Sequence, residues 1–514
     1  MNPARAQQML ERARWAAKAF STYDRASVLR IAEAVAQVAE DNAERYAEWA
    51  VRETGFGVVE HKAVKNRLCS RGIMDAYRDH DYVTPRVDPA RKMVEIPRAA
   101  GVVLALTPST NPVSTVYVKV LLALLTRNAI VVSPHPLAKE CCADACRTLA
   151  AAAVAAGAPD GVVQVVEEPS IPLVEALMAD ERTDVVLATG GVAVVRAAYS
   201  SGNPALGVGP GNVPALVDAT ADLARAAEKL MDSKAFDNSV LCTNESVLLV
   251  EESVADRLLR AMSRRGAHLL DEEECGRLRE VMFPGGRFDT SFVGRSALDI
   301  AGRADVRVPP RTRVLLAPVE QVVDEEPFVH EKLAPVLAVV RVPTVRAGIR
   351  AAAAVLRIGG AGHSAVIHST DPGVVVAYAA AVRVLRVTVN EGGSTGSAGF
   401  GTHLAPSMTI GTGFVGRSSL GENLEPRHLV DWTRVAHSVE AGERFPAYDG
   451  LVPWAAPRGP VPPYPVASNL RAEATSPSAP TAPTDRSLSE ELPGKLREEL
   501  RRLIIEELTT LVRG

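Results

Sequence analysis

The sequence predicts an α/β protein made of a doubly wound parallel sheet, a second α/β domain and a polar tail. Two observations carry this prediction: short β-branched runs alternate with helical stretches, and 47% of the 514 residues are hydrophobic. Strands buried on both faces are typical of parallel sheets with helices on each side. A chain of this length and composition can bury about two or three domain cores.

The first predicted sheet lies between residues 101 and 218. The apolar run "GVVLALTP" predicts a buried strand, and Pro112 favours the start of the helix that follows it. Four more predicted strands follow in the same alternation with helices: "AIVVSPHP", "GVVQVVEE", "DVVLATGG" and "NVPALVDA". Five such strands form a parallel sheet, whose ligands bind beyond the carboxyl ends of the strands.

Polar and Gly-rich segments follow these strands, namely "TPSTNP", "SPHP", "TGG" and "GVGPGN". Each segment is a weak signal by itself. "GVGPGN" lacks the spacing of a dinucleotide fingerprint, and glycines at turns often serve only the backbone geometry. Because all four segments lie at one edge of the sheet, together they predict a nucleotide-binding site.

A second α/β pattern occupies the next part of the chain. Five further strands, from "SVLLVEES" to "RVTVN", alternate with helices such as "TVRAGIRAAAAVLRIGG". We therefore expect a cofactor domain at 1–238, with a return segment at about 416–452, and a catalytic domain at 239–415. A linker rich in Pro, Ala and Ser (453–487) and an amphipathic helix (488–514) follow.

Composition argues against several classes of function. A formal charge of −4 without Lys/Arg blocks argues against nucleic acid or an anionic membrane as partner. The N-terminal segment predicts an amphipathic helix rather than a signal peptide, and no apolar stretch is long enough to span a bilayer. Six cysteines without a disulfide framework fit a reducing, cytoplasmic compartment. Small-molecule chemistry is the function class that remains.

Cys242 stands between a polar loop and an apolar strand, and a cysteine in such a position is most often a small buried hydrophobic residue. Its context changes that expectation. Five segments occur in the order of one family: "TPSTNPVSTVYVKVLLALLTRNAIVVSPHP", "TGGVAVVRAAYSSGNPALGVGPGNVPALVD", "KAFDNSVLCTNESV", "HEKLAPVLAV" and "NLEPRHLVDW". Over about residues 1–440 the chain resembles CoA-acylating aldehyde dehydrogenases, including microcompartment enzymes and the aldehyde dehydrogenase half of aldehyde–alcohol dehydrogenases.

The resemblance implies an aldehyde dehydrogenase fold, with a Rossmann-like cofactor domain and Cys242 as nucleophile. The thiolate would attack a short aldehyde, hydride would pass to NAD(P)⁺, and water or CoA would release the thioacyl-enzyme. Hydrolytic relatives carry a glutamate base where this chain has "GVGPGNVP" without a carboxylate, so CoA is the expected acceptor. Glu245 is a conceivable substitute base, with a structural or solvent-facing role as the alternative.

The same resemblance implies the other catalytic roles. Asn111 or Thr110 corresponds to an oxyanion-stabilising asparagine, with turn formation as the alternative, and the Cys242 N–H is the second donor. His363 would lower the pKa of the thiol or relay the proton of CoA, unless it is only a packed histidine. Glu331 would orient the nicotinamide ribose, with a helix-cap or surface role as the alternative.

The cofactor pocket is expected at the polar strand ends. Ser133 and His135 stand where relatives place a lysine that binds the adenosine ribose, which leaves the choice between NAD and NADP open. The other candidates are Thr107, Pro108, Thr189, Gly190, Gly191, Gly209, Gly211 and Asn212.

Two further features have structural explanations. Cys141, Cys142 and Cys146 share a predicted helix without histidine partners or paired spacing, so helix packing is expected rather than a metal site. The Gly-rich loop "EGGSTGSAGFG" at 391–401 lacks the lysine of a P-loop. It either flanks the acyl or CoA channel or is a flexible connector.

Residues 488–514 predict an amphipathic helix that docks on a protein surface. Its apolar stripe consists of Leu496, Leu500, Leu503, Ile504, Leu508 and Leu511. A linker followed by such a helix resembles the encapsulation peptides that bind shell or cargo proteins of bacterial microcompartments. Docking on the protein's own oligomer, expected to be a homodimer or homotetramer, and a coiled coil are the alternatives. For the whole chain, the alternatives to an acylating enzyme are a hydrolytic aldehyde dehydrogenase and a non-catalytic scaffold.

Overall fold

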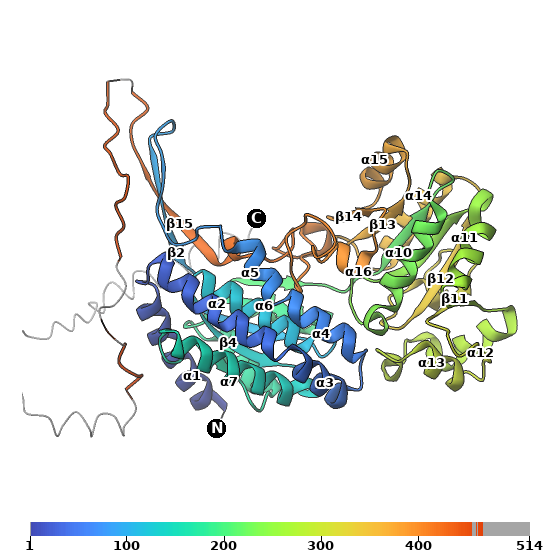
Figure 1. Cartoon of the computed structure of the whole chain (residues 1–514), viewed down its shortest axis with the longest axis horizontal. Coiled ribbons are helices and arrows are strands. Elements are labelled where there is room, and N and C mark those ends of the chain that lie inside the picture. Colours follow the sequence, from blue (N-terminus) through green and yellow to red (C-terminus); the bar gives the residue numbers. More distant parts are fainter. Residues whose placement is uncertain (1, 441, 455–458, 460, 466–514) are drawn as a thin grey trace, which may run out of the picture. The chain divides into compact units, whose positions relative to one another are not determined.

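The described part of the chain contains two parallel sheets and one antiparallel sheet, together with the helices that pack on them, and Figure 1 shows its computed structural model. The structure describes residues 2–440, 442–454, 459 and 461–465. The predicted helix at 488–514 and most of the predicted linker lie outside these residues.

The first sheet has five parallel strands in the order β5-β4-β3-β6-β7. The strands are β3 (Val102–Thr107), β4 (Ala129–Pro134), β5 (Val163–Val165), β6 (Val185–Thr189) and β7 (Ala205–Val208). The chain moves outward from β3 in both directions, so the strand order reverses between β3 and β6. Ligands of open α/β sheets bind at this reversal, outside the carboxyl ends of the strands.

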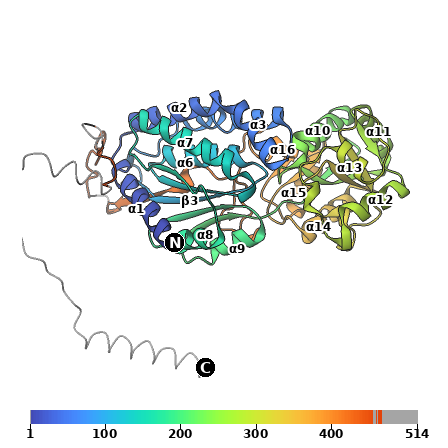
Figure 2. The ribbon, with the colours of Figure 1, turned by 90° about the horizontal axis from the view of Figure 1, so that it is seen from below.

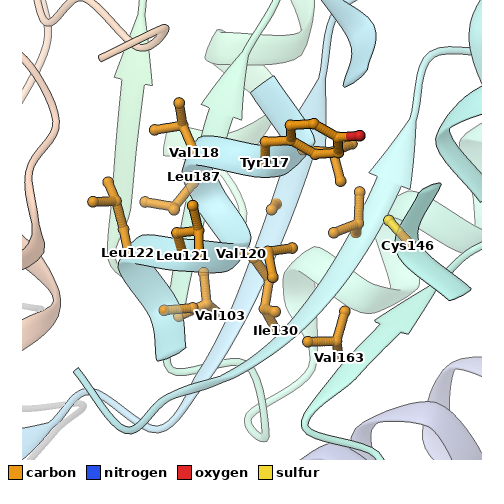
Figure 3. Packing of buried hydrophobic residues seen from close by; sticks show 14 of the residues in the cluster. Val103, Tyr117, Val118, Val120, Leu121, Leu122, Ile130, Cys146, Val163 and Leu187 are labelled. Carbon is orange, nitrogen blue, oxygen red and sulfur yellow. The ribbon is translucent and has the colours of Figure 1, made fainter. Parts of the chain in front are cut away.

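Helices cover both faces of the first sheet, which confirms the predicted doubly wound arrangement. The helices of this part of the chain are α1 (Asn2–Phe20), α2 (Arg25–Asp41), α3 (Ala43–Thr54), α4 (Val59–Leu68), α5 (Arg71–Tyr77), α6 (Pro112–Leu125), α7 (Lys139–Ala155), α8 (Ile171–Ala179) and α9 (Val192–Tyr199). Figure 2 shows α2, α6 and α7 on one face and α1 and α8 on the other. Every residue of α6 is buried, and its Tyr117, Val120 and Leu121 share a core with Val103 and Ile130 of the sheet (Figure 3).

The fifth strand of the first sheet differs from the prediction. The sequence predicts "NVPALVDA" as this strand, but the observed edge strand is β7. Strand β8 (Val213–Val217) lies in the second sheet instead. All of β8 is buried, a pattern that indicates a central strand without indicating which sheet it joins. β7 is short and contains Gly207, so its strand signal is weak. The predicted boundary at residue 238 therefore does not separate the two sheets.

The second sheet has seven parallel strands in the order β10-β11-β12-β9-β8-β13-β14, which confirms the second α/β pattern. Besides β8 they are β9 (Glu245–Glu251), β10 (Ala267–Leu269), β11 (Val314–Pro318), β12 (Val336–Val342), β13 (Ala365–His368) and β14 (Val387–Val389). One face packs against α10 (Leu223–Ala235) and α11 (Glu252–Arg264). The other packs against α12 (Glu272–Met282), α13 (Ala297–Arg303), α14 (Val345–Ile358) and α15 (Pro372–Ala381).

A small antiparallel sheet connects the end of the described chain to its first half. Its strands, in the order β1-β2-β15, are β1 (Arg86–Asp88), β2 (Met93–Ala99) and β15 (Val430–Ala436). Leu424 and Leu429, which precede β15, are buried in the core around the first sheet. Within the described residues, no helix combines the length and the apolar character needed to cross a bilayer.

Candidate active site

Cys242 lies just before a strand of the second sheet, close to the segment that connects the two parallel sheets. It follows the 3₁₀ helix η2 (Phe236–Ser239) and precedes β9, while Gly211 precedes the neighbouring strand β8. β8 and β9 are parallel and adjacent, with Val213 opposite Glu245, so both segments meet at the amino edge of the second sheet. Because β7 ends at Val208, residues 209–212 run from the carboxyl edge of the first sheet to this point.

Gly211 touches the nucleophile segment directly. A Cβ atom at this position would lie 2.0 Å from the Cys242 carbonyl oxygen, so no other residue fits without moving the segment. The Gly211 N–H donates to Glu331 Oε1 at 3.0 Å. Three residues predicted for the site from separate segments are thus brought together.

The turn that leads to Cys242 has an unusual backbone. Asp237, Asn238 and Ser239 adopt left-handed φ values of 51°, 50° and 65°. Such a conformation costs a non-glycine residue about 1–2 kcal/mol, so neighbouring contacts must hold it. Asp237 Oδ1 accepts a hydrogen bond from Val58 N at 2.8 Å, and Asn238 Nδ2 donates to Gly294 O at 2.9 Å.

Cys242 is half-buried as a residue, whereas the other five cysteines are buried. Burial of the sulfur and the charge of Glu331 raise the pKa of the Cys242 thiol to about 12. The Arg386 guanidinium and the backbone N–H of Cys242 act in the opposite direction. The thiol is therefore neutral at pH 7, and forming the thiolate requires a proton acceptor or a change in its surroundings.

Asn111 is buried at the start of α6 and faces the nucleophile segment. Its Nδ2 lies 3.5 Å from Val240 O, two residues before Cys242, and 3.3 Å from Thr110 Oγ1. Its Oδ1 accepts a hydrogen bond from Lys65 Nζ at 2.5 Å. The amide N–H group is thus the end that points toward the nucleophile segment, as an oxyanion donor must. The Thr110 hydroxyl oxygen accepts a hydrogen bond from Asn111 Nδ2.

His363 is fully buried near the Arg386 guanidinium. Burial and the charge of Arg386 lower the pKa of His363 to about 3, so the ring is neutral at pH 7. Its Nδ1 lies 2.9 Å from Ser364 Oγ, and its Nε2 has no hydrogen-bond partner among the described residues. Arg386 donates to the backbone carbonyls of Gly362 and His363, at 3.0 Å and 2.8 Å. The charge of Arg386 also acts to lower the pKa of the Cys242 thiol, so this guanidinium influences both His363 and Cys242.

Glu245 is a structural residue at the start of β9. Its carboxylate accepts hydrogen bonds from Ser233 Oγ and Gly393 N, both at 2.7 Å. Gly393 begins α16 (Gly393–Gly396), which lies in the Gly-rich loop at 391–401. The solvent-facing alternative for Glu245 is therefore wrong, and the loop is fixed to the strand that follows Cys242.

The carboxyl edge of the first sheet suits a dinucleotide. Thr107 and Thr189 end the two strands that flank the reversal of strand order. The Thr107 hydroxyl is buried and, among the described residues, has no hydrogen-bond partner, while Thr189 Oγ1 lies 3.0 Å from Thr409 Oγ1. Gly190 and Gly191 lead into α9, and a Cβ on Gly191 would meet nothing within 4 Å. Helix N–H groups beside open space can bind phosphate.

Four more predicted pocket residues lie along this edge. Ser133 is buried near the end of β4, and His135 caps the turn that follows, where its Nδ1 accepts from Leu137 N at 3.1 Å. Pro108 and Gly209 follow β3 and β7 directly. At Pro108 and Gly209, the carboxyl edge of the first sheet therefore presents backbone rather than charged side chains.

Asn212 points away from the edge. Its amide is buried and donates to Val329 O at 3.0 Å and to Val355 O at 3.4 Å. These bonds tie the start of β8 to the interior of the second α/β unit, so this side chain holds the scaffold.

A hollow of about 550 Å³ lies elsewhere, between α1, α7 and β5. Its walls include Arg5, Arg12, Cys146 and Arg147, and none of the predicted site residues lines it. It lies apart from the edge on which the chemistry is placed.

Several buried charges near the site are not predicted from the sequence. Lys65 and Asp237 form an ion pair behind the nucleophile turn, and Lys119 Nζ donates to Leu106 O and Leu187 O at the carboxyl ends of β3 and β6. One available signal was the pair of lysines three residues apart in "HKAVKN", which lie on one helix face and need a buried acid if that face is covered.

Comparisons with known proteins identify the family. The aldehyde dehydrogenase family model matches residues 1–271. An aldehyde-alcohol dehydrogenase of Clostridium acetobutylicum is 37% identical over 443 residues, covering 82% of this chain and 51% of the relative. A succinate-semialdehyde dehydrogenase (acetylating) of Clostridium kluyveri is 35% identical over 453 residues, covering 88% of this chain and 99% of the relative. The chain spans about half the length of the aldehyde-alcohol dehydrogenases it matches.

Solved structures agree with the family model. An acetylating aldehyde dehydrogenase from Geobacillus thermoglucosidasius superposes with a TM-score of 0.84 at 37% identity, covering 86% of this chain and 98% of that one. A propionaldehyde dehydrogenase from the fucose utilisation microcompartment of Clostridium phytofermentans has a TM-score of 0.78 at 27% identity, covering 85% and 98%. The predicted resemblance and fold are confirmed, and the chain belongs to the aldehyde dehydrogenase family.

Proposed function

We propose that the protein is a CoA-acylating aldehyde dehydrogenase, which oxidises a short aldehyde to an acyl-CoA. The observation that carries the proposal is Cys242 itself: it is the one cysteine of the six that is not buried, and Asn111 Nδ2 lies 3.5 Å from the carbonyl oxygen of Val240, two residues earlier. The nearby carboxylates already accept backbone hydrogen bonds, Glu245 from Gly393 and Glu331 from Gly211. This arrangement favours a thiol over water as the acyl acceptor. The acetylating relatives support the same choice.

The first half of the reaction takes place on Cys242. The thiolate attacks the aldehyde carbon, and the carbonyl oxygen becomes an oxyanion held by the Cys242 N–H and Asn111 Nδ2. Loss of one such donor typically lowers kcat by about 10²–10³-fold. Collapse of the oxyanion expels the hydride and leaves an acyl group on the sulfur as a thioester.

NAD(P)⁺ accepts the hydride when it is bound. The residues that fit it are Thr107, Gly190 and Gly191, because they offer an unpartnered hydroxyl and helix N–H groups at the carboxyl edge of the first sheet. Glu331 lies beside Cys242 and Gly211, where it can orient a ribose next to the reacting carbon.

The second half transfers the acyl group to CoA. The CoA thiol loses its proton, attacks the thioester carbon and displaces the Cys242 thiolate. The net reaction converts aldehyde, CoA and NAD(P)⁺ into acyl-CoA, NAD(P)H and a proton. His363 is neutral because burial lowers its pKa to about 3, so it cannot stabilise a thiolate as a cation. A ring with so low a pKa is also a weak proton acceptor, so relaying the proton of CoA requires a change in its surroundings.

A microcompartment is the proposed location of the enzyme. The support is the resemblance of residues 488–514 to encapsulation peptides and the similarity to a microcompartment propionaldehyde dehydrogenase. Shell or cargo proteins would be the partners of this segment, and the enzyme would be a homodimer or homotetramer. Confinement would retain a reactive aldehyde and recycle the cofactor locally.

The test is NAD(P)H formation at 340 nm from a panel of short aldehydes, with and without CoA, for the wild type and Cys242→Ala. We expect turnover that requires CoA and is lost in Cys242→Ala. A Cys275→Ala variant is the matched control, because Cys275 is buried in α12 within the core of the second sheet. Turnover indifferent to CoA would assign the protein to the hydrolytic branch. Absence of turnover with every pair would favour a scaffold.

A further inference from the structure

A cluster of buried charges lies directly behind the proposed oxyanion donor. It joins three separate elements: Lys62 and Lys65 from α4, Asn111 at the start of α6, and Asp237 in the turn before Cys242. The side chains of both lysines are 3% exposed and that of Asp237 is fully buried. None of these charges has a role in the proposed reaction.

The two lysines differ in a single respect that matters for the site. Both donate to Asp237 Oδ2. Lys62 also donates to the backbone oxygen of Thr110 at 3.1 Å, whereas Lys65 donates to the side-chain oxygen of Asn111 at 2.5 Å. Lys65 is therefore the lysine that contacts the amide group of Asn111.

An ammonium group fixes which way an amide points. Lys65 has three N–H donors and no acceptor when it is charged, so only the oxygen end of Asn111 can face it. The NH₂ end is then turned toward Val240 O and the segment that carries Cys242. A rotation of the amide by 180° would place the oxygen there instead, and an oxygen would repel the oxyanion.

Asp237 makes this charge tolerable inside the protein. Burial alone would raise the pKa of Asp237, but the charges of Lys65 and Lys62 hold it below its usual range, so the carboxylate stays ionised. The void beside both lysines and Asn111 measures about 10 Å³, at most the space of one water molecule. Hydration therefore cannot replace the ion pair. Gly57 allows the approach, because a Cβ there would lie 2.0 Å from Asp237 Oδ1.

We propose that Lys65 is a positioning residue, which holds Asn111 in the single amide orientation that stabilises the oxyanion. The inference rests on the proposed function, because it requires an oxyanion formed on Cys242. Asp237 serves the site in two ways. Its carboxylate binds Lys65, and its left-handed backbone forms part of the turn that leads to Cys242.

The test compares Lys65→Met with Lys62→Met. Both substitutions remove one buried ammonium from Asp237 and keep a similar length of side chain, but only the first frees the Asn111 amide. We expect Lys65→Met to lower kcat by about 10²–10³-fold, the effect of losing an oxyanion donor, with the aldehyde KM changed less than threefold. For Lys62→Met we expect a loss in kcat at least tenfold smaller. Thermal unfolding of both variants checks that they are folded.

Two further measurements separate positioning from a general disturbance. Alkylation of Cys242 by iodoacetamide forms no oxyanion, so its rate should be the same in wild type and Lys65→Met. In a double-mutant cycle with Asn111→Ala, the Lys65 substitution should cost less than threefold, because its effect passes through Asn111.

Three outcomes would overturn the proposal. They are equal losses of kcat in the two lysine variants, a slowed alkylation of Cys242 in Lys65→Met, and additive losses in the cycle. Failure of the proposed function itself is distinguishable, since it would appear as a wild type without CoA-dependent turnover.

Discussion

At the scale of single residues, the environment of Cys242 decides what it can do. It is the least buried of the six cysteines, yet burial of its sulfur raises the pKa of the thiol to about 12. A raised pKa lowers the fraction of thiolate at neutral pH, and the thiolate is the reactive form.

His363 provides a test of this buried environment through acid stability. Its pKa is about 3 in the folded protein and about 6.5 when unfolded. Because the folded-state pKa is the lower one, its contribution to stability is full above pH 6.5 and is lost as the pH falls toward 3. We expect the free energy of unfolding of the wild type, relative to His363→Asn, to fall by about 2 kcal/mol between pH 7 and pH 5.

Urea denaturation at both pH values measures this difference. A substitution of the exposed His403 by asparagine is the control for the loss of one histidine. An equal pH dependence in the wild type and His363→Asn would show that this histidine is protonated as easily in the folded protein as in the unfolded chain.

At the scale of elements, the amino ends of β8 and β9 determine the geometry of the site. Gly211 and Cys242 meet there because the two strands are neighbours, and the Gly211 N–H binds Glu331 in the same place. The left-handed turn at 237–239 gives the chain the direction it needs to reach this point.

Gly211→Ala tests this close approach. The new Cβ would lie 2.0 Å from the Cys242 carbonyl oxygen, so the nucleophile segment must move. A misplacement of about 1 Å can lower turnover by about 100-fold, and we expect a loss of at least this size in kcat. The control is Gly276→Ala in α12, where a Cβ meets nothing within 4 Å and the rate should be unchanged. A Gly211→Ala variant with normal kcat would contradict this geometry.

At the scale of the whole molecule, the catalytic part and the tail have separate tasks in the proposed function. The predicted docking helix lies outside the described residues, whereas the proposed catalytic residues all lie within them.

Deletion of residues 488–514 tests this separation. We expect the shortened enzyme to keep its CoA-dependent kcat and KM within twofold and to disappear from the shell fraction when it is coexpressed with a microcompartment. Immunoblotting of the purified shells measures the second effect. The full chain with Leu500, Leu503 and Ile504 changed to serine is the matched control, because it removes the apolar stripe without shortening the chain. Retention of the deleted form in the shells would show that another part of the enzyme binds them.

Local sequence determined much of this protein. The strands β3, β4 and β6 and the helix α6 follow from apolar runs and Pro112, because hydrophobic periodicity and the first-turn preference of proline are local properties. The order of five motifs identified Cys242 as the candidate nucleophile, and the comparisons confirm the family that this order implied.

Tertiary structure alone decided the remaining features. It placed β8 in the second sheet, buried Glu245 under a glycine loop, and paired Asp237 with Lys65 across 172 positions of the sequence. The physical reason is the same in each case. An apolar run predicts that a strand is buried, and a charge on a covered face requires a partner of opposite sign. Packing between segments that are distant along the chain selects the neighbouring strand and the partner charge.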